Sequence, residues 1–285
     1  MTEHPGDLEV AWIHGSESAK HNTDPDIQVH FYDPDTVILR QNMAVSFEAP
    51  FLYLLFGAER ALLLDTGATE SPELFPLRAT IDDLVAGWLG AHPEAADDYG
   101  LLVVHSHGHW DHIAGDSQFA DRPRTLVAPA DRAGAWPFFG FDHDPEAAVE
   151  IDLGGRIVDC LATPGHEEAA MTYYDRRTAL LLTGDTVYPG RLYIDEWEIF
   201  VRTVDRLVDW ADRHPISHVL GCHIEMTTTP GVDIPRYTSH HPGERVLELG
   251  AAHLRELQAE LARHEGLDEH VRYVLPDMIV TRFDG

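Results

Sequence analysis

The stretch that decides the fold is Leu101-Leu-Val-Val-His-Ser-His-Gly-His-Trp-Asp-His112, where an apolar run leads directly into four histidines and an aspartate. The apolar run predicts a short buried strand. The loop after it can aim several side chains into one pocket, and imidazole and carboxylate groups at alternating positions suit a divalent first-row metal. Histidines scattered by chance seldom fall in this H-x-H-x-D-H order. The stretch therefore predicts a metal-binding loop at the end of a strand.

The segments before this stretch predict strands and one helix. Residues 27–40 hold two apolar runs around Asp33-Pro-Asp35, a turn-forming cluster, and predict a hairpin. A second hairpin is predicted for residues 51–64, where near-continuous apolar residues indicate strands buried on both faces. Between Arg78 and His92 the apolar residues recur at helical spacing, which predicts an amphipathic helix that covers a sheet.

The segments after the histidine run continue the alternation of strands and helices. Strands are predicted at residues 125–128, 156–159, 178–182 and 218–221, and helices at 196–214 and 243–264. Such alternation is typical of layered α/β proteins. We expect a single domain over residues 1–285, with a core at about 45–225, N-terminal strands at 27–45 and a C-terminal helical extension at 243–264.

The composition narrows the classes of partner. Twenty basic residues against 49 acidic ones give a formal charge of −29, which repels polyanions. We therefore expect a small-molecule substrate and no nucleic acid, although such acidity also suits plain solubility. The apolar runs are too short to span a bilayer, and the first thirty residues lack the apolar core of a secretory signal, so we expect a cytoplasmic protein. Cys160 and Cys222 are expected to be buried thiols, and a homo-oligomer stays open.

Further motifs flank the histidine run in a fixed order. Asp65-Thr-Gly67 precedes it, and Thr163-Pro-Gly-His166, Thr183-Gly-Asp185-Thr and Gly221-Cys-His223 follow it. Together with the histidine run, these motifs resemble the metallo-β-lactamase superfamily over about residues 45 to 225. The resemblance implies that family's fold, a four-layer αβ/βα sandwich of the α/β class.

The resemblance also implies a binuclear site. Its ligands would be His107, His109 and His166 on the first ion, Asp111, His112 and His223 on the second, and Asp185 as the bridge. We expect two divalent ions, zinc first, with manganese or iron(II) as alternatives. Two such cations share one water, lower its pKa and polarise a carbonyl or phosphoryl group, so the resemblance implies hydrolysis by a shared hydroxide. Asp111 is expected to relay a proton to the leaving group as well.

Departures from the family's best-known branches narrow the activity. True β-lactamases generally lack a bridging aspartate at the position of Asp185, glyoxalase II-like thioesterases follow theirs with Gly-Cys-Gly-Arg, and the flavodiiron branch has glutamate in place of His109. The chain has Val187-Tyr-Pro-Gly-Arg191. We expect hydrolysis of a lactone, carboxylic ester or thioester. The alternatives are a mononuclear-iron dioxygenase of the persulfide-oxidising type and a non-catalytic metal-binding module of the same fold.

Several other residues have two interpretations that the sequence leaves open. Tyr188 has the D-x-x-Y spacing of lactonases, in which a tyrosine hydroxyl supports a developing oxyanion, but a buried core tyrosine explains it as well. His105 supports the ligands from behind or simply packs. His240 and His241 contact the substrate or lie in a surface loop. The aromatic loop containing Trp136 and its neighbouring phenylalanines is a lid, an interface patch or ordinary loop core.

Overall fold

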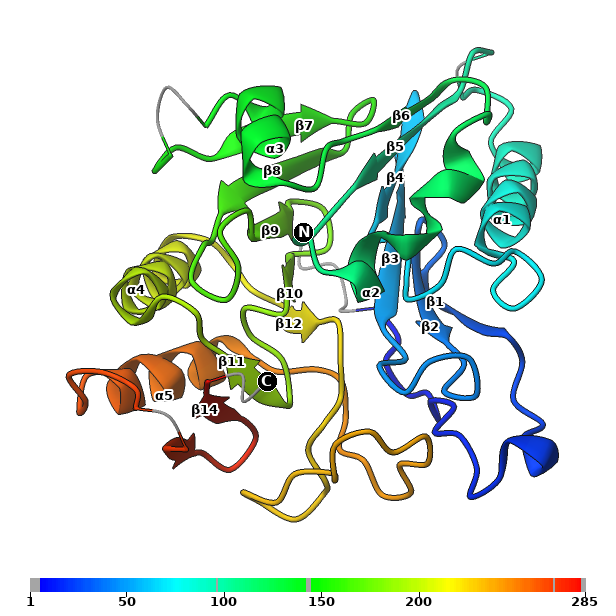
Figure 1. The fold of residues 1–285 in the computed structure, drawn as a ribbon. Helices are drawn as coiled ribbons and strands as arrows, with labels where there is room; N and C mark the ends of the chain where they lie inside the picture. Colours follow the sequence, from blue (N-terminus) through cyan, green and yellow to red (C-terminus); the bar gives the residue numbers. More distant parts are fainter. Residues whose placement is uncertain (1–5, 96, 142–144, 269, 283–285) are drawn as a thin grey trace. The chain divides into compact units, whose positions relative to one another are not determined.

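The computed structural model describes residues 6–95, 97–141, 145–268 and 270–282 (Figure 1). The chain divides into two compact units, which we describe separately. Unit 1 comprises Met1–Ala130, Glu150–Val158 and Tyr237–Pro242, and unit 2 comprises Asp131–Val149, Asp159–Arg236 and Gly243–Gly285. Within the described part of the chain, the helices are all too short or too polar to cross a membrane.

Unit 1 is built on a six-stranded sheet with strand order β1-β2-β3-β4-β5-β6. Its strands are β1 (Ile27–Asp33), β2 (Thr36–Gln41), β3 (Phe51–Phe56), β4 (Arg60–Leu64), β5 (Gly100–Val104) and β6 (Thr125–Val127). The first four strands are antiparallel, and β4, β5 and β6 run parallel. Both predicted hairpins and the predicted strand before the histidine run are therefore confirmed.

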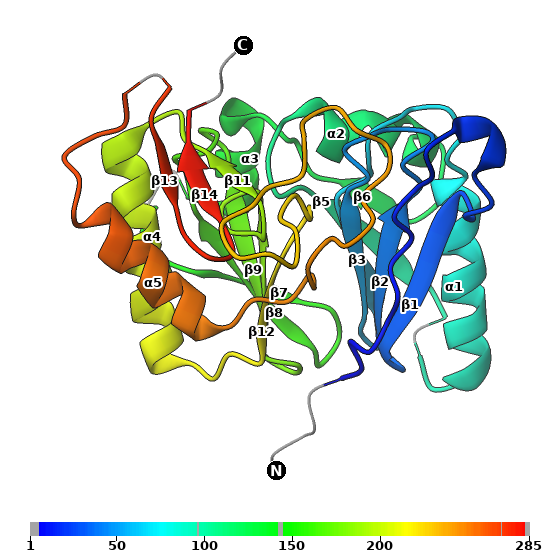
Figure 2. The same cartoon turned by 90° about the horizontal axis from the view of Figure 1, so that it is seen from below.

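A single long helix, α1 (Leu77–Ala91), covers one face of this sheet (Figures 1 and 2). It buries Leu77, Ile81 and Val85 against side chains of the inner strands, as the predicted apolar stripe requires. All six residues of β3 are buried, because the strand lies inside the sheet with both faces covered. Three shorter helices complete the unit: η1 (Ala19–His21), α2 (Trp110–Ile113) and η2 (Ala114–Phe119).

A five-stranded sheet has strand order β12-β10-β9-β8-β7. Unit 2 supplies β9, β10, β12 and most of β8, whereas most of β7 and the start of β8 fall in the Glu150–Val158 segment of unit 1. Unit 2 also has a sheet of order β11-β14-β13. The strands are β7 (Val149–Asp152), β8 (Ile157–Ala162), β9 (Met171–Asp175), β10 (Leu180–Gly184), β11 (Arg191–Tyr193), β12 (His218–Gly221), β13 (Arg272–Val274) and β14 (Ile279–Thr281). β9 pairs antiparallel and β12 parallel with β10, so β10 is an interior strand and β12 an edge strand.

Two helices, α4 (Trp197–Arg213) and α5 (Ala251–Leu261), lie side by side in both views and pack on one core with the strands of unit 2 (Figures 1 and 2). That core joins Phe200 and Leu207 of α4 to Leu254 and Leu257 of α5. The predicted helix at 196–214 is confirmed. The helix predicted at 243–264 begins only at Ala251. Its N-cap residue, Gly250, has an extended backbone, so the residues before Ala251 are not helical.

The aromatic loop is in fact partly helical. α3 (Arg132–Phe139) is capped by Asp131, whose carboxylate accepts from the Gly134 amide, and ends at Gly140 in the left-handed conformation. Pro137 lies inside this helix, which is why the sequence favoured a loop. Phe139 and Phe141 are buried, whereas Phe138 is exposed. Trp136 is partly buried, so two of the four aromatic residues belong to the core and the other two do not.

Candidate metal centre

The candidate ligands of unit 1 follow β5, beside the end of the parallel strand β4. Asp65 directly follows β4 and is fully buried in the left-handed conformation, with φ of 67°. Its carboxylate accepts hydrogen bonds from the Ser106 amide at 2.7 Å and from the Ser106 hydroxyl at 2.8 Å. Because parallel strands end at the same edge of a sheet, Asp65 anchors the start of the histidine run.

Asp65 also orients a ligand. Nδ1 of His112 donates to Asp65 Oδ2 at 2.9 Å, which turns Nε2 of that ring to within 3.3 Å of Asp111 Oδ2. A carboxylate behind one ring nitrogen is the usual support for a histidine that binds a metal through the other. Donor atoms on one tetrahedral zinc lie roughly 3.3 Å apart. His112 and Asp111 therefore fit a shared ion.

The other two histidines of the run form a second pair. Nε2 of His107 lies 2.9 Å from Nδ1 of His109, and Nδ1 of His107 lies 3.1 Å from the Ser106 hydroxyl. His107 is buried and His109 is exposed. His107 Nε2 and His109 Nδ1 therefore lie close enough to bind one ion, and the Ser106 hydroxyl contacts the other nitrogen of His107. A divalent-metal site needs such donors and such support.

His105 is not part of either pair. Its Nε2 lies 3.2 Å from Asp116 Oδ2, and the other oxygen of Asp116 accepts from the Thr66 hydroxyl at 2.8 Å. Thr66 in turn donates its amide to the His112 carbonyl at 2.7 Å. His105 therefore belongs to a partly buried polar network that holds the loop, which favours support over direct contact with an ion.

The candidate ligands of unit 2 come from three separate loops. His166 lies between β8 and β9, Asp185 directly follows β10, and His223 follows β12. Since β10 and β12 are parallel neighbours paired at Gly184 and Gly221, Asp185 and His223 emerge at the same edge of the sheet.

The carboxylate of Asp185 faces the two histidines with different oxygens. Oδ1 lies 3.3 Å from His223 Nε2, and Oδ2 lies 3.9 Å from His166 Nε2. Nδ1 of His166 donates to the Tyr193 carbonyl at 2.7 Å, which fixes the ring with Nε2 toward the carboxylate. This two-sided arrangement is the one that a bridging carboxylate needs.

Close backbone packing holds the His223 loop. A Cβ atom on Gly221 would lie 2.2 Å from Tyr188 Cβ and 2.9 Å from the Gly184 carbonyl, so only glycine lets β12 approach the loop after Asp185. The Tyr188 ring lies edge-on to His223, with centroids 5.7 Å apart. Tyr188 therefore packs directly behind a candidate ligand.

The Tyr188 hydroxyl is turned into the core. It donates to the Arg191 carbonyl, and Glu225 Oε2 lies 3.0 Å away. Burial above all, with the nearby negative charge of Glu225, raises the pKa of Tyr188 well above its ordinary value, so the phenol stays protonated. These contacts favour the core interpretation of Tyr188, and an oxyanion role stays a prediction.

Glu225 is the centre of a charged network that the sequence did not reveal. It accepts from the Arg191 amide at 2.8 Å and from Arg191 Nη2 at 2.7 Å. Arg191 also donates to Asp233 at 3.0 Å, and Asp233 accepts a further bond from Arg272. The Arg191 side chain is 5% exposed. This network links the loop that contains Tyr188 and Arg191 to Glu225, two residues after the candidate ligand His223.

The remaining predicted residues lie elsewhere. His240 and His241 belong to unit 1, where the His241 amide donates to the His14 carbonyl and the His240 ring packs against His14. His241 is buried, so the surface-loop interpretation does not describe it. Cys160 and Cys222 are buried thiols, as predicted.

The chain belongs to the metallo-β-lactamase superfamily, whose family model matches residues 47–219. The predicted α/β fold class is thereby confirmed. Solved structures agree at the level of the fold: a metallo-β-lactamase from Pontibacter korlensis has a TM-score of 0.51 at 14% identity and covers 84% of this chain and 100% of that one. The DIM-1 metallo-β-lactamase has a TM-score of 0.53 at 11% identity, covering 85% and 99%.

The names of two curated relatives describe a thioesterase and a hydrolase of a glutathione conjugate. The chain is 27% identical over 209 residues to the acyl-coenzyme A thioesterase MBLAC2 of Gallus gallus, covering 61% of this chain and 72% of that protein. It is 28% identical over 152 residues to the hydroxyacylglutathione hydrolase of Rhizobium meliloti, covering 52% and 55%. The chain thus spans about half the length of the second relative.

Proposed function

We propose that this protein is a binuclear metallo-hydrolase that cleaves an ester-like bond in a small molecule. The observation that carries the proposal is Asp185, whose two carboxylate oxygens face two different histidines. A monodentate ligand of one ion has no use for that arrangement, whereas a bridge between two ions requires it. The names of the relatives put thioesters first, ahead of lactones and carboxylic esters.

The proposed ligand sets combine the donors of both units. They are His107, His109 and His166 for one ion, Asp111, His112 and His223 for the other, and Asp185 for both. The donors are imidazole nitrogens and carboxylate oxygens, which suit zinc first and manganese or iron(II) next. Ions bound by these residues would lower the pKa of a coordinated water and polarise the carbonyl of the substrate.

The side chains of the protein have distinct tasks in this proposal. Asp65 and the Tyr193 carbonyl hold His112 and His166 in the tautomers that present Nε2. Asp111, which is partly exposed beside His112, is placed to carry a proton from the attacking water to the leaving group. Tyr188, if its hydroxyl turned from the Arg191 carbonyl, would be the candidate donor to an oxyanion.

The deciding experiment is metal quantification on protein purified without chelators, followed by assay against thioesters, lactones, carboxylic esters, phosphodiesters and β-lactams. We expect two zinc or manganese ions per chain and turnover of the ester-like group. One iron per chain with oxygen consumption would establish the dioxygenase alternative instead. Two bound metals with no hydrolysis of any of these substrates would establish a metal-binding module.

A further inference from the structure

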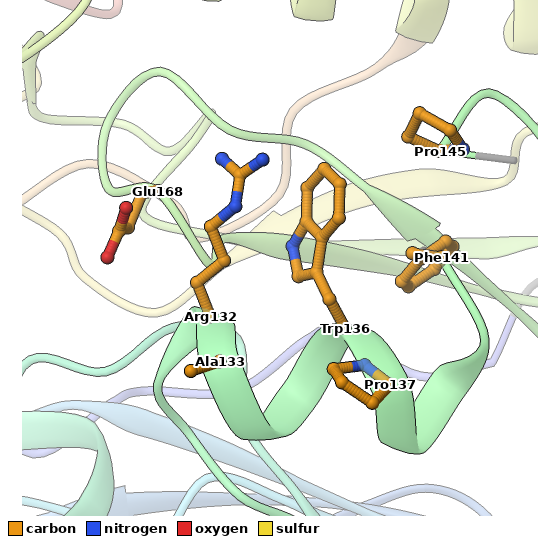
Figure 3. Close-up of a pocket in the computed structure, with 7 residues that line it drawn as sticks. All are labelled: Arg132, Ala133, Trp136, Pro137, Phe141, Pro145 and Glu168. Carbon is orange, nitrogen blue, oxygen red and sulfur yellow. The ribbon is translucent and has the colours of Figure 1, made fainter. Parts of the chain in front are cut away.

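Unit 2 contains a pocket that the metal ligands do not line. Its volume is about 490 Å³, and its walls are Arg132, Ala133, Trp136, Pro137, Phe141, Pro145 and Glu168. Arg132 and Trp136 are one helical turn apart on α3 and rise side by side from it (Figure 3). A volume of this size accommodates a small organic ligand.

The pocket has a charged end and an apolar end. Figure 3 shows Glu168 beyond Arg132 on one side of the Arg132–Trp136 pair, and Phe141 with Pro145 on the other. The Arg132 guanidinium lies over the indole ring at 3.9 Å from its centroid, so its planar face is covered and its edge is left to donate. A ligand that fills the pocket therefore needs an apolar body and a polar head.

No acidic side chain in the described part of the chain pairs with Arg132. Among the residues that the structure describes, neither Arg132 nor Glu168 makes a hydrogen bond or an ion pair with another side chain, and the two are not paired with each other. Most other arginines of this chain, which has 49 acidic residues, do have such partners. A guanidinium stacked on an aromatic ring keeps its planar fork of N–H donors free to bind a carboxylate with two hydrogen bonds.

Hydrogen bonds from α4 hold the part of the pocket wall that contains Pro145. Arg206 of α4 donates to the carbonyl oxygens of Pro145 at 3.0 Å, Glu146 at 2.9 Å and Ala162 at 2.7 Å. Ala162 ends β8, the strand that leads to His166, and Glu168 follows that ligand by two residues. The pocket is therefore tied to the loop that carries a candidate metal ligand.

We propose that this pocket binds a monocarboxylate with an apolar or aromatic body. The carboxylate lies against the edge of Arg132, and the body lies between Trp136, Phe141 and Pro145. Glu168 at the same end, together with the formal charge of −29, disfavours a dianionic phosphate. A carboxylic acid released by ester hydrolysis is one such ligand, a link that rests on the proposed function.

Direct binding tests the proposal without any turnover. The probe is 3-phenylpropionate, titrated by calorimetry into the metal-loaded full chain, with 3-phenylpropanol, phenyl phosphate and 2-phenylethylamine as comparisons. We expect 3-phenylpropionate to bind roughly tenfold more tightly than each of the others. Arg132→Gln should weaken it about tenfold. Arg202→Gln, which removes the same charge from an exposed position on α4 outside the pocket, should not.

Glu168→Gln tests whether the negative charge of Glu168 opposes binding of the ligand, as expected for a carboxylate. Removing the negative charge beside the carboxylate should tighten binding of 3-phenylpropionate about threefold. Weaker binding would mean that Glu168 contacts the ligand and would overturn the proposal in favour of an amine or zwitterion. Equal affinities for Arg132→Gln and Arg202→Gln would also overturn it, because a carboxylate bound to the metals alone does not depend on Arg132. Thermal unfolding of each variant confirms that it is folded.

Discussion

The candidate ligands of the two units are held in opposite ways. In unit 1 four candidate ligands fall within one short run, from His107 to His112, and a single buried carboxylate, Asp65, anchors the run. In unit 2 three ligands come from loops far apart in the sequence, and they depend on a carbonyl, a glycine and the Glu225–Arg191 pair. The first set is local, whereas the second is a product of long-range packing. Substitutions remote from the ligands should therefore be felt more in unit 2.

The largest effect is expected for Asp185→Asn. An amide has one neutral carbonyl oxygen in place of the two anionic oxygens that would bridge the ions, so we expect the metal content to fall and kcat/KM for a thioester to drop at least about hundredfold. Asp159→Asn is the matched control, because Asp159 is also a buried aspartate of unit 2 but pairs with Arg176 at 2.6 Å. If both variants kept two metals per chain, Asp185 would not be a bridge.

Asp65→Asn tests the anchor of unit 1. The change removes the acceptor of the His112 Nδ1 proton, and we expect roughly 10- to 100-fold weaker affinity for one of the two ions. Competition with a chromophoric chelator measures this affinity. Asp116→Asn changes the partner of His105, which is further from the ligand rings in the same network, and should weaken the affinity less. Equal losses in the two variants would show that unit 1 is not held by one carboxylate.

Glu225→Gln tests whether unit 2 depends on distant support. Replacing the carboxylate weakens its bonds from Arg191 and leaves that guanidinium, 5% exposed, with less compensating charge. We expect the free energy of unfolding to fall by about 1–3 kcal/mol, together with weaker metal binding. Glu260→Gln on α5 removes surface contacts to the largely exposed Arg263 and to His264, and should cost less than about 1 kcal/mol. Unfolding in urea with metal quantification separates these results.

Tyr188→Phe refines the same comparison. Loss of the hydroxyl leaves the Arg191 carbonyl without its donor, so we expect about 1 kcal/mol of lost stability and roughly a threefold lower kcat, with both metals retained. A fall in kcat of about a hundredfold at unchanged stability would instead show that the hydroxyl stabilises an oxyanion. Steady-state kinetics and thermal unfolding decide between the two.

The smallest effect concerns the outer end of the charged network. Burial opposes ionisation of Asp233, but hydrogen bonds from Arg191 and Arg272 outweigh it and lower the pKa of this carboxyl. Asp233 therefore stabilises the fold fully above its unfolded pKa of about 3.9, and this contribution is lost as the pH falls through the lower folded pKa. We expect Asp233→Asn to be less stable than the wild type at pH 7 and to differ less from it at pH 3. Urea unfolding at the two pH values measures the difference, and a constant gap would contradict it.

Much of the fold could be predicted because the decisive segments are periodic. The two hairpins, α1 and α4 all show apolar spacing that matches their structure. β9 was missed because Met171–Asp175 is buried on both faces yet carries polar residues. β11, β13 and β14 have three residues each, too few for a period to show. Tertiary pairing, not local preference, makes these segments strands.

The candidate ligands could be predicted, but their supports could not. Clustered histidines and aspartates indicate a metal site, so the run from His107 to His112 could be predicted as a set of candidate ligands. The Tyr193 carbonyl behind His166 carries no side-chain signal, and Glu225 looks like any other glutamate of an acidic chain. Asp65 offered the one hint, as an aspartate directly after a buried strand, where a carboxylate has to find donors.

The position of β12 at the edge of its sheet predicts that its candidate ligand, His223, separates before Asp185, which follows the interior strand β10. β12 is held on one side by β10 and on the other by a single bridge between Val219 and Leu249, whereas β10 lies between two strands. Edge strands fray more readily than interior ones. We therefore expect His223 to detach while Asp185 is still in place, and an ion bound through His223, as proposed, would leave first and return last. Metal exchange in this protein would then be timed by the opening of one short strand rather than by unfolding of the domain.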